Sequence, residues 1–344
     1  MPDGAALLSG KSFIASTLDR NSWRPNQSIY LDDGTKVMTR ALGVIELIPQ
    51  THNKCGLLLS AGIHGNETAP IELIDKLLDD CINARVIVRR PTLLILGHPE
   101  AMKAETRFIE HNMNRLFMGV HARKAFRGSV DAERAHALEL QVTRFANRYS
   151  LTEHYDLHTA IRDSFIERFA LKPKREHEEI SMLSEEAKRV FLDMGVQALV
   201  YQHKPASTFS SYTSRTFKTD AYTVELGKVH RFGENDLDHY KDTYQCLCEL
   251  VSLNKQSETT NQKDLQEFEV CHELLNDSDA FQLLVDEDAA NFSEFKQGTA
   301  LTRSPSSEYR VQQNLEYLIF PNSKVPVGQR AGLMLKSVDG RQPE

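Results

Sequence analysis

The stretch GLLLSAGIHGNETAP, residues 56–70, joins a short apolar run to the start of a helix. Residues 56–61 are apolar and bounded by glycines, which is typical of a strand buried on both faces. Pro70 suits the first turn of a helix, whose apolar stripe consists of Ile71, Ile74, Leu77 and Leu78. A buried strand followed by an amphipathic helix indicates an α/β architecture.

The chain on either side repeats this alternation of strands and helices. The apolar patterns predict strands over residues 28–31, 36–39, 41–48, 85–88, 92–97, 155–158, 166–171, 197–201 and 221–226. They predict further helices over residues 135–149, 180–194 and 237–251, the first capped by Ser129 or Asp131. We therefore expect an α/β fold with a largely parallel or mixed sheet flanked by helices.

The composition changes after residue 253. Residues 254–264 (NKQSETTNQKD) are polar and aperiodic, which is typical of a linker. Beyond them, strand patterns at residues 317–320 and 332–336 are separated by prolines and a glycine. We expect a catalytic domain over residues 1–253 and a smaller C-terminal β-rich domain over residues 265–344.

Charge and cysteine content exclude several classes of function. The 344-residue chain has a net charge of −7, which disfavours nucleic acid or an anionic membrane as a partner. No apolar run is long enough for a membrane span, and no signal peptide is evident. The five cysteines include no C-x-x-C pair, so we expect a reduced, cytoplasmic protein. A small anionic substrate would require a local group of arginines.

The polar residues that follow the first buried strand predict a metal site. His64 and Glu67 lie just past the strand end, where open α/β sheets bind ligands, and Gly65 between them would relax the backbone. Catalytic zinc is commonly held by two histidines and a glutamate. The motif alone also fits two solvated polar residues, and the chain's 13 histidines provide many decoys.

A second strand end offers the third ligand. Asp156 and His158 follow each other at the two-residue period of a strand, so their side chains share a face. Glu225 lies in another apolar, strand-like run, where a carboxylate is costly to bury without a role. The alternative for Glu225 is a carboxylate at a strand end that faces solvent.

Five motifs in order make the chain resemble a known family. They are SAGIHGNETAP (60–70), MNRLF (113–117), DLHTAIR (156–162), VELGK (224–228) and FPN (320–322) followed by GQRAGLML (328–335). This series resembles the aspartoacylase/succinylglutamate desuccinylase family of zinc carboxypeptidase-like hydrolases, from about residue 40 to the C-terminus. The resemblance implies a carboxypeptidase-like mixed sheet flanked by helices, with a smaller C-terminal β domain.

The resemblance also implies residue roles. One Zn²⁺ per subunit would be held by His64, Glu67 and His158, and Glu225 would be the general base. The substrate carboxylates would be bound by Arg107, Asn114, Arg115 and Arg215, with Arg162 as a further candidate. The expected reaction is hydrolysis of N-succinyl-L-glutamate by a zinc-activated water, giving succinate and L-glutamate. It is the last step of the succinyltransferase route of arginine catabolism.

Two alternatives remain open at this stage. A zinc carboxypeptidase acting on peptide C-termini would use the same metal site and the same Asn-Arg pair. A metal-free binding protein could keep the fold without the reaction. Aspartoacylases carry a substrate-contacting tyrosine in the C-terminal domain, whereas this chain has Pro326 and Val327 in that region. That difference disfavours N-acetylaspartate as the substrate.

Overall fold

A large mixed β-sheet runs through the whole protein. The structure is a computed structural model that describes residues 8, 10–179, 181–254 and 264–338. The strands of this sheet, in spatial order, are β1 (Ser28–Tyr30), β2 (Lys36–Thr39), β3 (Val44–Ile48), β5 (Thr92–Leu96), β4 (Cys55–Ala61), β6 (Ser150–Ala160), β9 (Asp220–Lys228), β7 (Phe169–Lys172), β8 (Ala198–Tyr201), β10 (Gln266–Leu275), β16 (Arg330–Ser337), β15 (Leu315–Ile319) and β12 (Ser293–Lys296).

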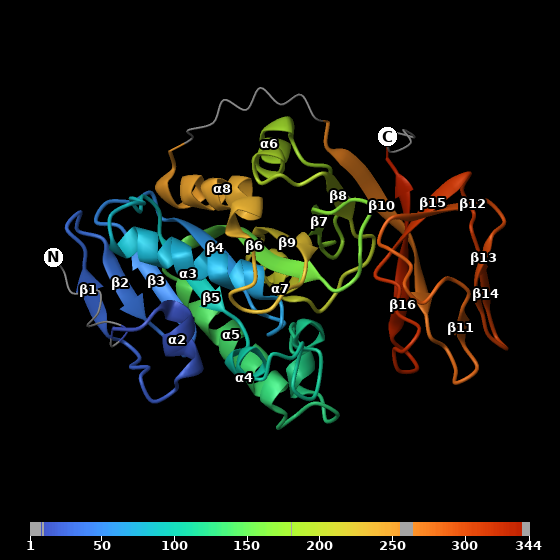
Figure 1. Ribbon diagram of the computed structural model, residues 1–344, viewed down its shortest axis with the longest axis horizontal. Coiled ribbons are helices and arrows are strands. Elements are labelled where there is room, and N and C mark those ends of the chain that lie inside the picture. Colours follow the sequence, from blue (N-terminus) through green and yellow to red (C-terminus); the bar gives the residue numbers. More distant parts are fainter. Residues whose placement is uncertain (1–7, 9, 180, 255–263, 339–344) are drawn as a thin grey trace.

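Helices cover both faces of the first part of this sheet (Figure 1). The α-helices are α2 (Phe13–Leu18), α3 (Thr68–Ile82), α4 (Pro99–Lys103), α5 (Val130–Ala146), α6 (Glu185–Asp193), α7 (Phe209–Phe217) and α8 (Lys241–Ser252). Short 3₁₀ turns are η1 (Met113–Arg115), η2 (Val120–Ala122) and η3 (Leu237–Tyr240). The predicted mixed sheet flanked by helices is confirmed.

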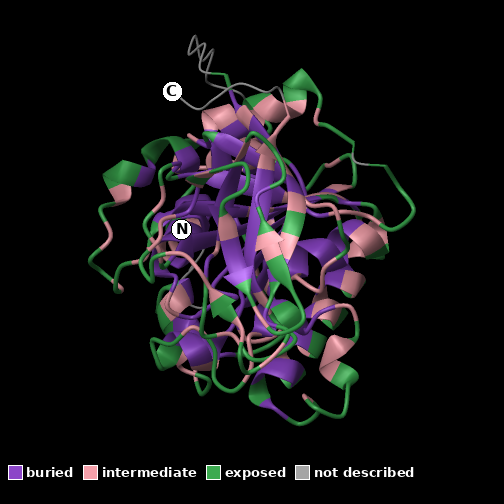
Figure 2. Cartoon of the chain, turned by 90° about the vertical axis from the view of Figure 1, so that its right-hand side faces the viewer, coloured by how far each residue is buried: buried purple, intermediate pink, exposed green. Residues whose placement is uncertain are grey.

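Strand β4 shows why the chain forms layers. Leu57 and Leu59 pack with α2, α3, α6 and α8 on one face, whereas Leu58 packs with α5 and α7 on the other. Successive side chains of a strand point to opposite faces, so a strand covered on both sides must be apolar throughout. The central strands are accordingly buried along their length, with exposure concentrated in the loops (Figure 2).

The C-terminal strands extend the same sheet and gather at one end of the molecule (Figure 1). β10 pairs in parallel with β8 and antiparallel with β16, and a separate three-stranded sheet packs nearby. That small sheet contains β11 (Gln282–Leu283), β13 (Ala300–Arg303) and β14 (Glu308–Arg310). The C-terminal region is therefore β-rich, as expected. The boundaries at 253 and 265 stay a prediction, and residues 255–263 of the predicted linker lie outside the described residues.

The predicted strand over residues 85–88 is wrong. The backbone N–H groups of Arg85 and Val86 donate to the carbonyl of Asp80, at the end of α3. The Arg85 side chain also pairs with Asp79 and Asp80. These local contacts take the hydrogen-bonding groups that a neighbouring strand would have used, so the segment closes the helix instead.

Two helices differ from the sequence expectation. α6 begins at Glu185 after the capping residue Ser184, later than the predicted start at Ile180, which lies outside the described residues. α7 was not predicted, because its sequence FSSYTSRTF is rich in serine and threonine, which favour caps and turns. Tertiary packing of Phe209 and Tyr212 against α5 stabilises this helix.

Two further expectations concern the chain as a whole. Among the described residues, no helix has both the length and the apolarity that a membrane span requires. All five cysteines are unpaired, in agreement with the expected absence of a disulfide framework.

Candidate metal centre and active site

Three side chains from two neighbouring parallel strands converge at the sheet's carboxyl edge. His64 and Glu67 follow β4, and His158 lies near the end of β6. Glu67 bridges the two imidazoles: its Oε1 lies 2.8 Å from His64 Nδ1, and its Oε2 lies 2.7 Å from His158 Nδ1. All three side chains are buried. The structure brings the three predicted residues together, and their role as metal ligands stays a prediction.

Each imidazole is oriented by an oxygen acceptor on its other nitrogen. His64 Nε2 lies 3.0 Å from Asn112 Oδ1, and His158 Nε2 lies 2.9 Å from Asp156 Oδ2. An N–H on each Nε2 can donate to these oxygens, and in a neutral imidazole that tautomer leaves the Nδ1 lone pair directed toward Glu67. Such outer contacts fix the tautomer and ring orientation of metal-ligating histidines.

The donor set fits a divalent zinc ion. Two imidazole nitrogens and a carboxylate lie within 4.8 Å of one another, the ligand types of a catalytic zinc site. Burial and the charge of Arg107 lower the pKa of His64 to about 4. Burial also acts on His158, but the carboxylates of Asp156 and Glu67 outweigh it and raise its pKa well above the usual value. The His64 imidazole is therefore neutral near pH 7, which is the form in which histidine binds a metal ion.

Gly65 is required for a reason that differs from the sequence expectation. Its backbone does not adopt the left-handed conformation that glycine alone tolerates well. A Cβ at Gly65 would instead lie 2.1 Å from the carbonyl carbon of Ala101 in α4. The glycine therefore allows close approach of α4, and this contact holds the turn between His64 and Glu67.

A buried hydrogen-bond chain continues inward from His158. Asp156 Oδ1 accepts from Ser60 Oγ at 2.6 Å, and Ser60 Oγ lies 2.9 Å from His154 Nε2. His154 Nδ1 in turn lies 2.7 Å from Thr213 Oγ1 in α7. Because every member is buried and partnered, the chain locks Asp156 and through it the His158 ring.

Glu225 reaches the same site from the third strand. It pairs in register with His158 across the parallel strands β6 and β9 and is 7% exposed. Its Oε2 is buried without a hydrogen-bond partner among the described residues. Burial raises the pKa of Glu225 to about 7, with Glu67 adding to the effect and His158 opposing it. A buried, unpartnered carboxylate beside the cluster is suited to accept a proton.

Arg107 and Asn114 take different positions around the cluster. Arg107 Nη1 donates to Glu67 Oε1 at 2.6 Å, and 34% of its side chain remains exposed. Asn114 is buried and accepts from the Phe209 backbone N–H at 2.9 Å. Asn114 therefore ties η1 to the start of α7, which positions its neighbour Arg115.

Arg115 and Arg330 form a second centre of positive charge. Burial, together with the nearby charges of Arg330 and Arg107, lowers the pKa of Arg115 to about 9, while Glu273 opposes them. Arg115 nevertheless keeps an accessible surface and stays protonated at neutral pH. Arg330 lies on β16, with its Nη1 4.0 Å from Glu273 Oε1. The C-terminal strands thus bring a cation to the catalytic region.

Arg215 and Arg162 are engaged elsewhere. Arg215 lies in α7, where it pairs with Glu176 and its Nη1 donates to the Ala206 carbonyl at 3.5 Å. Arg162 follows β6 and donates to the carbonyl of Glu287. Both side chains therefore bind partners outside the cluster of His64, Glu67 and His158.

Sequence reasoning missed Asn112 and Arg330. Asn112 directly precedes the MNRLF motif, and Arg330 lies within GQRAGLML. Both residues therefore adjoin or belong to motifs of the sequence, but only the folded chain puts Asn112 beside His64 and Arg330 near Arg115. No local pattern distinguishes such side chains from solvated ones.

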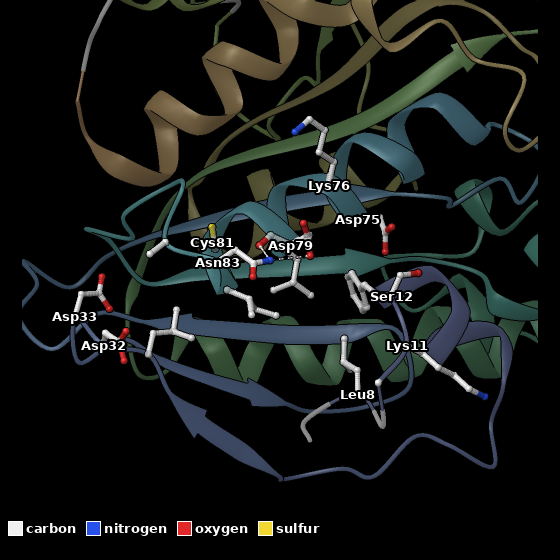
Figure 3. A pocket seen from close by; sticks show the side chains of 16 residues that line it. Leu8, Lys11, Ser12, Asp32, Asp33, Asp75, Lys76, Asp79, Cys81 and Asn83 are labelled. Carbon is white, nitrogen blue, oxygen red and sulfur yellow. Dashed lines mark hydrogen bonds between the residues drawn. The ribbon is translucent and has the colours of Figure 1, made fainter. Parts of the chain in front are cut away.

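A cavity of about 710 Å³ lies away from this site, beside α2 and α3 (Figure 3). Asp32, Asp33, Asp75 and Asp79 contribute to its lining, whereas His64, Glu67, His158 and Glu225 do not. Asp75 accepts from the backbone N–H of Ile14 at 2.8 Å, near the start of α2. The carboxylate therefore has a structural role there, apart from the metal cluster.

Comparison with known proteins places this geometry in a family. Residues 54–251 match the family model described as succinylglutamate desuccinylase/aspartoacylase catalytic domain. The chain belongs to this family. Residues 263–338 match the barrel-sandwich hybrid domain of the same family. Succinylglutamate desuccinylases and aspartoacylases are amide hydrolases, so the chain is a member of a family of enzymes.

Similar members of the family cover nearly the whole chain. A succinylglutamate desuccinylase of Shewanella frigidimarina is 37% identical over 333 residues, which is 96% of each chain. The crystal structure of the enzyme from Vibrio parahaemolyticus has a TM-score of 0.88 at 31% identity and covers 96% of each chain. That from Vibrio cholerae has a TM-score of 0.87 at 31% identity, with 95% coverage of each. The expected fold, with its smaller C-terminal β domain, is confirmed.

Proposed function

We propose that this protein hydrolyses N-succinyl-L-glutamate to succinate and L-glutamate, the last step of the succinyltransferase route of arginine catabolism. The observation that carries the proposal is the unpartnered Glu225 carboxylate beside the cluster of His64, Glu67 and His158. The names of the similar proteins support the choice of substrate. The reaction breaks one linear amide bond and requires an activated water.

We propose one Zn²⁺ per subunit, held by His64, Glu67 and His158. A bound zinc ion supplies a Lewis acid that polarises the amide carbonyl and lowers the pKa of water toward about 7. Asn112 and Asp156 hold the two imidazoles with their Nδ1 atoms turned toward Glu67. The chain thus contributes a preorganised set of ligands.

Glu225 moves the proton in the proposed reaction. Its Oε2 accepts a proton from the attacking water as the new C–O bond forms at the succinyl carbonyl carbon. The same carboxyl then donates that proton to the glutamate nitrogen as the C–N bond breaks. A pKa raised toward neutrality suits both roles, because the group can gain and lose a proton near pH 7.

Arginines bind the three carboxylates of the substrate in this proposal. Arg107 and Arg115 lie on the segment that includes η1, and Arg330 adds a positive charge from β16. Guanidinium groups recognise carboxylates in bidentate fashion, so they can fix the amide beside Glu225. Asn114 holds η1 in place through the Phe209 backbone. Arg215 keeps its predicted binding role only if it leaves its ion pair with Glu176.

A substrate series tests the function. Purified protein loaded with zinc is assayed with N-succinyl and N-acetyl derivatives of L-glutamate and L-aspartate, and with a peptide that has a free C-terminus. We expect the highest kcat/KM with N-succinyl-L-glutamate. Faster cleavage of the peptide would favour the carboxypeptidase alternative. Failure of the protein to take up zinc, together with no turnover of any substrate, would favour the metal-free binding protein.

A further inference from the structure

A second group of metal-ligating side chains lies between η2 and α5. Among the described residues, His121, His136 and Glu139 place one ligand atom each within 4.8 Å of one another, as the His64 cluster does. We propose that these three residues form a second site for a late first-row divalent cation such as Zn²⁺, separate from the catalytic centre. Its occupancy links the segment that carries Arg115 to helix α5.

The geometry brings two elements together at this site. His121 Nε2, in η2, lies 3.1 Å from Glu139 Oε2 in α5, and the rings of His121 and His136 have centroids 4.7 Å apart. His136 and Glu139 are three residues apart in a helix, so they share one face. The side chains of His121 and Glu139 are 12% and 13% exposed, whereas His136 is exposed. A cation can therefore enter from solvent, and His136 can rotate onto it.

The chemistry of the donors favours a zinc-like cation. Two imidazoles and a carboxylate suit zinc and its neighbours, whereas magnesium and calcium prefer oxygen ligands. Glu139 is already oriented, because its Oε1 accepts from the Met118 backbone N–H at 2.7 Å. That bond leaves Oε2 turned toward His121, in the manner of the outer contacts that fix metal ligands.

Occupancy would affect the part of the chain that holds the substrate arginine. η1 contains Asn114 and Arg115, and η2 follows it after Met118, whose backbone has a positive φ of 61°. In the described structure, Glu139 holds this segment through Met118 and His121. A cation bound also by His136 adds a further link from η2 to α5, so we expect it to restrain residues 113–122.

The test compares His136→Ala with a matched control. His136 is exposed, so the variant should fold normally, which circular dichroism verifies. The control is His239→Ala, since His239 pairs with Glu167 at the same 3.1 Å but belongs to no three-residue cluster found among the described residues. Zinc-loaded full-length protein is titrated with further Zn²⁺ by calorimetry. Hydrogen exchange of residues 113–122 is followed in parallel.

We expect wild type and His239→Ala to bind one more equivalent of Zn²⁺ than His136→Ala, or to bind it at least ~10-fold more tightly. Hydrogen exchange over residues 113–122 should slow with this equivalent in wild type and not in His136→Ala. Equal stoichiometry and affinity of Zn²⁺ binding in all three proteins would overturn the proposal that these residues form a metal site. Binding without slower exchange would overturn the link to the arginine segment. The difference between variants does not depend on whether the catalytic centre holds zinc.

Discussion

His158 and Glu225 occupy paired positions on the adjacent parallel strands β6 and β9. Paired residues of neighbouring strands point to the same face and lie about 5 Å apart. The hydrogen bonds of the sheet therefore place the proposed metal ligand and the proposed general base side by side, with Glu67 reaching His158 from the turn after β4. The sheet itself sets the distance on which the proposed reaction depends.

Glu225→Gln should separate proton transfer from metal binding. The amide keeps the size of the side chain but cannot accept the proton, so we expect kcat to fall by ~10²–10⁴-fold. Zinc content, measured by atomic absorption, should stay at the wild-type value because Glu225 is not among the proposed ligands. Glu167→Gln, which alters an exposed glutamate paired with His239, should leave kcat unchanged. Wild-type turnover in Glu225→Gln would refute the assignment of Glu225 as the general base.

Arg330→Ala should weaken substrate binding. A hydrogen bond between charged groups contributes about 1.5–3 kcal/mol, so we expect kcat/KM for N-succinyl-L-glutamate to fall by ~10–100-fold, mostly through KM. Steady-state kinetics at fixed ionic strength measures this change. The control is Arg310→Ala, which removes an exposed arginine paired with Glu308. An unchanged KM in Arg330→Ala would show that Arg330 does not bind the substrate.

Asn112→Ala should lower zinc affinity without removing a ligand. Asn112 Oδ1 lies 3.0 Å from His64 Nε2 and also accepts from the Asn114 backbone N–H at 3.0 Å. Loss of such an outer contact typically costs ~10–100-fold in metal affinity, which competition with a chelator measures. Asn112→Asp retains an oxygen acceptor and should recover most of the affinity. If the Asn112→Ala and Asn112→Asp variants bind zinc equally well, Asn112 does not orient His64 for metal binding.

Asp131→Asn should destabilise the protein. Asp131 is buried, lies 2.8 Å from His98 Nε2, and accepts from the backbone N–H groups of Ile109, Glu110 and His111. Removing one partner of a buried pair costs ~3–5 kcal/mol in the free energy of unfolding, which urea denaturation measures. Glu133→Gln, exposed in the same helix, is the control. A loss of less than ~1 kcal/mol in the free energy of unfolding would contradict a stabilising pair between Asp131 and His98.

Asp131 also gives the stability of the wild type a defined pH dependence. Burial opposes ionisation, but the His98 and backbone hydrogen bonds hold the pKa of Asp131 well below its usual value. A carboxyl group with a depressed pKa stabilises the fold above the unfolded-state pKa of about 3.9 and loses that contribution as pH falls below it. The unfolding free energies of wild type and Asp131→Asn should therefore differ most above about pH 4, and the difference should shrink progressively as the pH falls below that value.

The local elements around the site could be predicted from sequence. The apolar run before His64, the two-residue period of Asp156 and His158, and Glu225 in an apolar strand all follow from patterns within a few residues. Such patterns reflect which face of an element is buried. The local patterns gave a wrong prediction at residues 85–88, where contacts with the end of α3 replace strand pairing. They also did not predict α7, because its polar composition is typical of turns although the helix is packed.

The sequence by itself determined the strand ends that carry His64, Glu67, His158 and Glu225, because burial patterns and strand period are local properties. Only the tertiary structure decided what surrounds them. The close approach of α4 to Gly65 and the position of Asn112 on His64 join segments that are far apart along the chain. The same holds for Arg330 near Arg115. Contacts of this kind depend on how the layers pack, and no pattern of neighbouring residues encodes them.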